Sequence, residues 1–263
     1  MLSALQAELQ LYPTPYTYAR IASWVSAMAL AAILNERQGI SRSNTLALCA
    51  ICLPLSIVGS RLLDALEYLG SYGSFTEAIG RNGSSIYGGL ALSFLAVWAY
   101  AAWRGVAVLR LLDAGGPSIL LGESVSRVGC FLAGCCYGVP WNGPWAVTFP
   151  KESFAFGDQV ARGLLAPTAE HTLAVHPVQL YSTVLAFLIC LWLVRAFFRR
   201  RSDGEVFCRC LIGYGGLRLV MAPLRIESLG SMKFFSVAFI VAGTAGLVAL
   251  HGMRRAERRV VTG

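Results

Sequence analysis

Seven long apolar stretches run through this chain, and they constrain its fold more than any other feature of the sequence. They lie near residues 18–35, 45–65, 84–103, 117–135, 177–197, 206–222 and 233–251. Each approaches the roughly 20 residues that a helix needs to cross the hydrocarbon core of a bilayer, although some include a polar residue. Helices also pair all their backbone groups internally, as lipid requires. The pattern therefore predicts an all-α polytopic membrane bundle of about seven transmembrane helices.

The composition agrees with a bilayer as the solvent for this chain. Of its residues, 56% are hydrophobic and only 14% are charged, whereas soluble domains carry about 25% charged residues. The sequence shows no internal repeat, no low-complexity tract and no separate soluble segment. We therefore expect a single membrane-embedded domain over residues 1–263, whose longest loop spans residues 137–176.

The distribution of positive charge predicts the orientation of the bundle. Of the 22 lysines and arginines, 13 fall in the loops at 36–44, 104–113 and 195–209 and in the C-terminal tail, whereas six fall on the opposite side. Cytoplasmic loops carry the excess of such residues, so the N-terminus is expected outside and the C-terminus in the cytoplasm. The loop at 137–176 is then periplasmic. Orientation and anionic lipid headgroups account for the basic excess, and no nucleic-acid partner is expected.

Three arginines, namely Arg61, Arg127 and Arg218, fall within the predicted spans. Such a residue costs roughly 2.5–3.5 kcal/mol at the bilayer centre on insertion scales, and it usually faces a cavity or a partner. Glu123 lies four residues before Arg127, so the two side chains share a helix face. One hypothesis is a buried ion pair that holds helices together. The other is an anion site, because guanidinium groups suit phosphate geometry.

The eight cysteines do not indicate a disulfide framework, because most fall within or beside apolar spans or on the predicted cytoplasmic side. Cys49 and Cys52 form a CxxC without a second pair nearby, which argues against a zinc site. Small buried hydrophobic residues are the default interpretation of these thiols. Cys135 and Cys136 are the exception, because they lie at the outer membrane edge. For these two cysteines, a disulfide and a reactive thiol are both open interpretations. We expect no metal site.

Several segments resemble motifs of the prolipoprotein diacylglyceryl transferase family. Residues 126–138, which read SRVGCFLAGCCYG, resemble its signature of roughly GRIGNFxNGExYG. Residues 84–89, 144–150 and 176–181 resemble its MSFHGG, PWGVxFP and HPxQLY. Tyr214, Gly215, Arg218 and Arg225 resemble its YGxxRxxxExxR motif. Gly59 and Arg61 resemble its GxR motif. The matches keep their order over positions 59–225.

The resemblance implies a multi-pass transferase of the bacterial inner (cytoplasmic) membrane. Its donor is phosphatidylglycerol and its acceptor is the lipobox cysteine thiol of a prolipoprotein. A diacylglyceryl thioether forms and glycerol phosphate leaves, so lipoproteins mature by this post-translational step. The remaining partners are membrane lipids, and the reaction requires no cofactor. Positive charge beside the phosphate leaving group lowers the barrier, and the acceptor thiol must lose its proton.

The same resemblance implies the residues of the site. Arg127 and Arg218 would hold the phosphate, and Tyr87 would be the third catalytic residue. The substrate-binding positions would be Arg61, Gly88, Glu123, Gly129, Cys130, Gly134, Tyr137, Gly138, His176, Gln179, Tyr181, Tyr214 and Arg225.

This sequence departs from the family pattern at several of these positions. Tyr87 stands where the family commonly has histidine, Cys130 where it has asparagine, and Cys135 where it has glutamate. Ala133, Ser182 and Ala222 likewise replace polar or acidic residues. Three hypotheses therefore stay open. The first is diacylglyceryl transfer to prolipoproteins, the second is a transferase with the same donor and another acceptor, and the third is a non-catalytic lipid-binding or transport protein.

Overall fold

The computed structural model describes residues 14–67, 86–226 and 229–262, and its regular elements in these ranges are helices. They are α2 (Pro15–Arg37), α3 (Arg42–Glu67), α5 (Ile86–Arg104), α6 (Val108–Ala133), α7 (Phe154–Ala161), α8 (Val178–Phe197), α9 (Glu205–Met221), the short 3-10 helix η2 (Ala222–Leu224) and α10 (Leu229–Thr262). The predicted all-α membrane bundle is confirmed.

Five helical segments of the described residues are long and apolar enough to cross a membrane. They are Pro15–Arg37, Arg42–Leu66, Val178–Phe197, Glu205–Leu224 and Lys233–Ala256. The other two expected spans correspond to α5 and α6, which are not among these five. The prediction of an apolar span near 117–135 placed the start of α6 too late. The helix begins at Val108 and includes Arg110 and Asp113.

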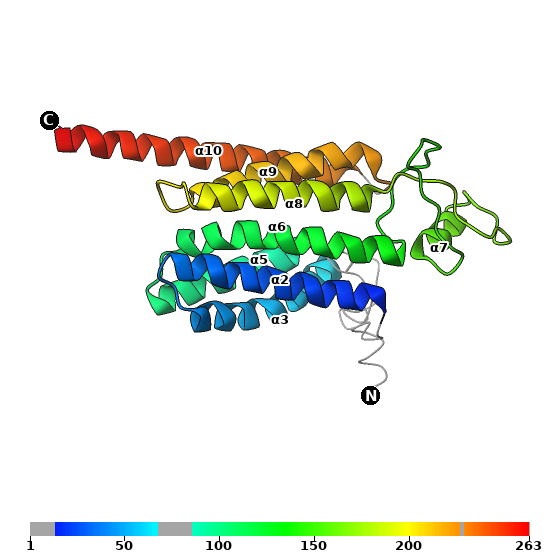
Figure 1. The fold of residues 1–263 in the computed structure, drawn as a ribbon, viewed down its shortest axis with the longest axis horizontal. Coiled ribbons are helices and arrows are strands. Elements are labelled where there is room, and N and C mark those ends of the chain that lie inside the picture. The colour runs from blue at the N-terminus through cyan, green and yellow to red at the C-terminus, as the bar shows by residue number, and fades with distance from the viewer. Residues whose placement is uncertain (1–13, 68–85, 227–228, 263) are drawn as a thin grey trace.

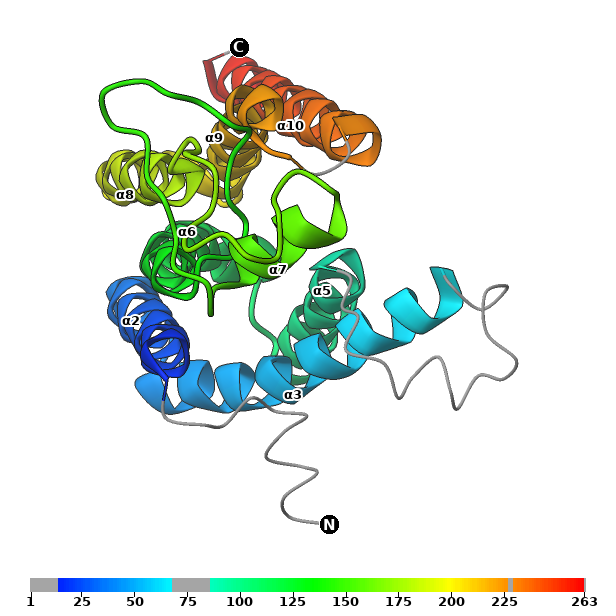
Figure 2. The ribbon, with the colours of Figure 1, turned by 90° about the vertical axis from the view of Figure 1, so that its right-hand side faces the viewer.

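The central position of α6 explains how it carries charged residues. In Figure 1, α6 lies between α2 on one side and α8 on the other, and the end-on view in Figure 2 agrees. It also packs against α9, while α3 pairs with α5 and α9 with α10. Its neighbours thus cover the faces of α6 that carry most of its buried residues, while Ile119 and Leu132 stay exposed.

The polarity of the bundle is suited to a bilayer, with apolar side chains on its surface and polar ones among those inside. Large exposed hydrophobic residues include Trp98, Val184, Leu188, Phe234 and Val248. Buried polar residues make hydrogen bonds between helices. The Ser23 hydroxyl donates to the Gly122 carbonyl at 2.7 Å, and the Ser124 hydroxyl donates to the Thr183 carbonyl at 2.9 Å. An extensive exposed apolar surface of this kind marks contact with lipid.

The chain passes back and forth along the bundle, so the ends of different helices meet in two places (Figure 1). Residues 134–176, including α7, cover one end, which we call the loop end. The turn between α8 and α9 and the C-terminus of α10 lie at the other, which we call the basic end. Because α3, α6 and α9 finish at the loop end while α5 and α8 start there, the described residues of the matched motifs are brought to this end (Figure 1).

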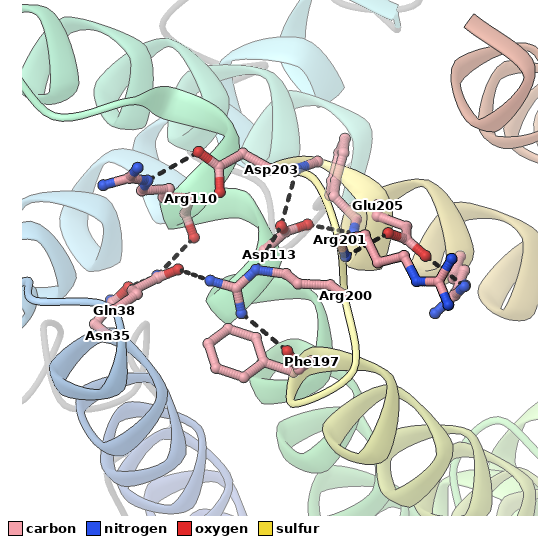
Figure 3. Close-up of polar contacts among 12 residues, drawn as sticks. Asn35, Gln38, Arg110, Asp113, Phe197, Arg200, Arg201, Asp203 and Glu205 are labelled. Atoms are coloured by element: carbon pink, nitrogen blue, oxygen red, sulfur yellow. Dashed lines mark hydrogen bonds and ion pairs between the residues drawn. The ribbon is translucent and has the colours of Figure 1, made fainter. Parts of the chain in front are cut away.

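A closed polar network holds the basic end together (Figure 3). The fully buried Asp113 carboxylate of α6 accepts hydrogen bonds of 2.8 Å from the backbone N–H groups of Gly204 and Phe207. Arg200 lies 3.5 Å from the same carboxylate and donates to Gln38, the residue that caps the end of α2, at 2.6 Å. The network therefore joins α2, α6 and the α8–α9 turn.

Candidate active site at the loop end

A left-handed turn at Gly134 ends α6 and redirects the chain into the loop. Gly134 has φ of 67° and ψ of 23°, and its N–H bonds back to the Phe131 carbonyl at 3.1 Å. A Cβ at this position would approach the Ser153 side chain to 2.8 Å. Glycine thus meets both the positive φ and the close approach. The turn sends Cys135 and Cys136 back toward the last turn of α6.

The pair predicted from the spacing of Glu123 and Arg127 is confirmed. The Arg127 Nε and Nη2 atoms donate to one carboxylate oxygen of Glu123, at 2.9 and 2.7 Å. Only 12% of the Arg127 side chain and 18% of the Glu123 side chain are exposed. The pair stays within one helix and leaves the Nη1 group of Arg127 outside it. Arg127 can therefore keep this partner and still donate to a bound anion.

The loop that follows Gly134 is held by segments from two distant parts of the chain. The Gln179 side-chain amide donates to the Cys135 carbonyl at 2.8 Å, and the Gly138 N–H donates to the His176 carbonyl at 3.1 Å. Gly138 also forms a β-bridge with Arg225, which is buried. Three of the matched segments, 126–138, 176–181 and 214–225, thus meet around one loop.

His176 is fixed by aromatic neighbours. Its ring stacks on Trp141 with centroids 4.2 Å apart and an interplanar angle of 9°. Its Nδ1 atom lies 3.4 Å from the Tyr181 hydroxyl, which makes a long hydrogen bond. These contacts give His176 a positioning role in the loop, and the stack on Trp141 could not be found from the sequence pattern.

A second polar contact ties α7 to the signature segment. The Tyr137 hydroxyl donates to the Asp158 carboxylate at 2.6 Å, and the Arg162 Nε atom donates to the same carboxylate oxygen at 2.8 Å. Burial opposes ionisation of Asp158, but these two hydrogen bonds lower its pKa below the ordinary value. Burial and the bond to Asp158 raise the pKa of Tyr137. The side chain of Tyr137 therefore anchors α7 over the site.

Three thiols meet beside the Gly134 turn. The Sγ atoms of Cys130, Cys135 and Cys136 all lie within 4.8 Å of one another. Cys130 is in the last turn of α6, and the other two follow the turn. Hydrogen bonds from the other two thiols lower the pKa of Cys136 despite its burial, and the charges of Arg127 and Arg225 act in the same direction. The sequence pattern singled out the adjacent Cys135 and Cys136. The closeness of Cys130 to them depends on the turn at Gly134 and was not predicted.

Two cavities adjoin this loop. A cavity of about 440 Å³, lined mainly by apolar atoms, lies between the start of α2, the end of α6 and residues 149–154. A smaller cavity of about 170 Å³ is lined by Cys135 and Cys136, with Tyr137, Asp158 and Arg162 among its other walls. The first offers apolar walls, whereas the second gives access to the thiols.

Other predicted site residues have different surroundings. Gly88 packs against the backbone of Gly59, where α3 and α5 cross closely, and Gly129 packs against Ala19 of α2. Tyr214 packs against the ring of Phe239. These three contacts support the helix packing around the site, and their roles in substrate binding stay predictions.

Two of the predicted arginines, Arg61 and Arg218, are only partly buried. Arg218 is partly buried near the end of α9, where its backbone carbonyl accepts a hydrogen bond from the Ala222 N–H. Arg61 is also partly buried, near the end of α3. Tyr87 lies in the first turn of α5, outside the residues whose side chains are described. Arg127, Arg225 and the three cysteines therefore lie near one another. The position of the Tyr87 side chain relative to them stays a prediction.

The family model described as prolipoprotein diacylglyceryl transferase matches residues 2–249 of the chain. The chain belongs to the prolipoprotein diacylglyceryl transferase family. The match covers every described element that contributes to the loop end, so the resemblance of the short motifs extends to the whole bundle.

Individual relatives agree with this membership. A protein of Finegoldia magna is 30% identical over 220 residues, which are 80% of each chain. A protein of Dehalococcoides mccartyi strain BAV1 is 28% identical over 231 residues, which are 86% of this chain and 83% of the relative. A protein of Clostridium tetani is 32% identical over 161 residues, but the match spans only 59% of its length. All three are named phosphatidylglycerol–prolipoprotein diacylglyceryl transferase.

Proposed function

We propose that this protein transfers the diacylglyceryl group of phosphatidylglycerol to the lipobox cysteine of prolipoproteins and releases glycerol phosphate. One observation carries the proposal, namely that the family's matched segments meet around a single loop beside Arg127 and Arg225. The names of the relatives agree with this donor and acceptor.

The reaction requires a carbon–sulfur bond to form and a carbon–oxygen bond to break. The acceptor thiolate attacks the glyceryl carbon that carries the phosphate, and glycerol phosphate leaves with the electron pair of the broken bond. Negative charge therefore grows on the phosphate in the transition state, where fixed positive groups stabilise it most. We assign this role to Arg127 and Arg218, with Arg225 beside them.

The pairing of Arg127 with Glu123 has a consequence for donor binding. Glu123 neutralises one positive charge and occupies the Nε and Nη2 atoms of Arg127. The Nη1 group is left to bind a phosphate oxygen, in an orientation that the pair has already fixed. Pre-positioned donors of this kind need no reorganisation during the reaction. The net positive charge of the site then comes from Arg218 and Arg225.

The surroundings of the loop suit a substrate that is half lipid. We assign the cavity of about 440 Å³ to an acyl chain of the donor, because its walls include Tyr16, Leu132 and Phe149. In the orientation that the charge distribution predicts, the loop end faces the periplasm of the bacterial inner membrane. Secreted precursors would therefore reach the site from that side.

The decisive experiment is a transfer assay on purified protein with labelled phosphatidylglycerol and a lipobox peptide. We expect a thioether product, and we expect Arg127→Ala to slow its formation by about 10²–10³-fold, the usual cost of removing one such donor. Arg199→Ala at the basic end is the matched control and should keep the wild-type rate. An Arg127→Ala protein that folds and transfers at the wild-type rate would remove Arg127 from the mechanism. Failure of the wild type to form product, with donor still bound, would exclude this acceptor.

A further inference from the structure

The thiols of Cys130, Cys135 and Cys136 form the one group of three metal-binding side chains within the described ranges whose ligand atoms lie this close together. A zinc ion with Zn–S distances of about 2.3 Å places its sulfurs about 3.8 Å apart. Sulfurs that already lie within 4.8 Å of one another need only small shifts to reach this spacing. The cluster therefore has the dimensions of three corners of a tetrahedral site.

Two positive charges lie near the cluster. Thiolates rather than thiols are metal ligands, and the guanidinium groups of Arg127 and Arg225 lie within electrostatic range of Cys136. Three thiolates around a divalent cation carry a net charge of −1, which Arg225 would balance, because Glu123 already neutralises Arg127. Soft sulfur ligands also select zinc over the hard cations magnesium and calcium.

We propose that Cys130, Cys135 and Cys136 bind one zinc ion whose fourth position is open to the thiol of the acceptor cysteine. Closed structural zinc sites have four protein ligands, whereas sites with three keep a position for water or substrate. Cys135 and Cys136 line the cavity of about 170 Å³, which gives an incoming side chain a route to the ion. The acceptor role rests on the proposed function, whereas binding of the ion does not.

Zinc would supply the activation that the replaced polar residues no longer provide. A coordinating thiol loses its proton outright, and metal coordination is one of the ways in which a nucleophile is activated. On binding, the acceptor thiol releases its proton to water. Its sulfur then attacks the glyceryl carbon, the carbon–oxygen bond breaks, and glycerol phosphate leaves as a dianion beside the arginines. No atom is oxidised or reduced. The proposal departs from the expectation of no metal that the family resemblance implies.

The proposal is tested by titrating the full-length reduced protein in detergent with Zn²⁺, and with Co²⁺ as a coloured substitute. We expect about one ion per chain and, for cobalt, the charge-transfer absorption of thiolate ligands. Cys135→Ser and Cys136→Ser should each weaken binding at least tenfold. Cys49→Ser, which removes a thiol far from the cluster, is the matched control and should bind as the wild type does. Thermal unfolding of each variant without metal separates loss of the ligand from loss of the fold.

The acceptor role has its own measurement. A lipobox peptide with cysteine should change the cobalt spectrum, whereas the same peptide with serine should not. Metal-free protein that transfers diacylglyceryl at the full rate overturns the role of zinc in activating the acceptor thiol and leaves the proposed function intact. A protein that binds zinc through these cysteines without forming thioether supports the metal site and rejects transfer to this acceptor. A disulfide among the three cysteines, with no metal uptake after its reduction, overturns the site itself.

Discussion

The two halves of α6 each carry a carboxylate, one fully buried and one partly buried, and the two groups have different partners. Toward the basic end, Asp113 is fully buried and receives hydrogen bonds from two backbone N–H groups more than 90 residues away in the chain. Toward the loop end, Glu123 pairs with Arg127 of the same helix, and both side chains keep some exposure. One carboxylate thus joins separate elements, whereas the other holds a single side chain in position.

The difference separates a polar group that joins distant elements from one that is paired within a single helix. A buried charge with all its partners supplied by the protein stabilises one arrangement of the chain and leaves little capacity for a ligand. A charge paired locally on one helix adds less to the fold and leaves donors for a substrate. The basic end has the first arrangement, and the loop end has the second.

The largest effect is expected for Asp113→Ala, because it leaves the backbone N–H groups of Gly204 and Phe207 and the charge of Arg200 without their shared acceptor. Breaking a buried pair from one side costs about 3–5 kcal/mol. Unfolding by heat or denaturant in detergent measures this loss. Asp203→Asn is the control, because its pair with Arg110 is well exposed, and such pairs contribute about 0–1 kcal/mol. Equal losses in the two variants would contradict the comparison.

A smaller effect, on binding rather than stability, is expected for Glu123→Gln. The glutamine oxygen can still accept from Arg127, so the guanidinium keeps its orientation while the neighbouring negative charge disappears. We expect the KM for phosphatidylglycerol to fall about fivefold, which corresponds to about 1 kcal/mol. The transfer assay at several donor concentrations measures it. An unchanged KM together with a large loss of stability would mean that Glu123 is structural, as Asp113 is.

The smallest effect concerns the Tyr137–Asp158 contact over the loop. Because the pKa of Asp158 is lowered in the folded protein, its contribution to stability is present above its ordinary pKa of about 3.9 and is lost as the pH falls through the lower folded value. Tyr137→Phe removes one of the hydrogen bonds that lower this pKa. The melting temperature of the Tyr137→Phe variant should be below that of the wild type near pH 7. This difference in melting temperature should shrink toward about pH 3. A difference that grows in acid would contradict this account.

The sequence predicted the helices well where periodic apolar composition alone decides them. The stretch expected at 177–197 corresponds closely to α8, Val178–Phe197. The sequence-based prediction was wrong for the start of α6, because Asp113 interrupts the apolar pattern there. The hydrogen-bond partners of Asp113 come from a distant turn and are known only from the folded chain. In the site, the Glu123–Arg127 pair followed from helical spacing. The three-thiol cluster did not, because it depends on the turn at Gly134 as well as on composition.

The shielded position of α6 also bears on how the protein is made. α6 is 26 residues long, but its charged and polar residues make it less apolar than expected of a membrane-spanning helix, and the translocon inserts such segments reluctantly when they are presented alone. We therefore expect α6 to need neighbouring helices when it inserts into the membrane. α2 is synthesised before it and α8 after it, and both pack along its length. Because α6 carries Arg127 and Cys130, assembly of the proposed site depends on completion of membrane insertion.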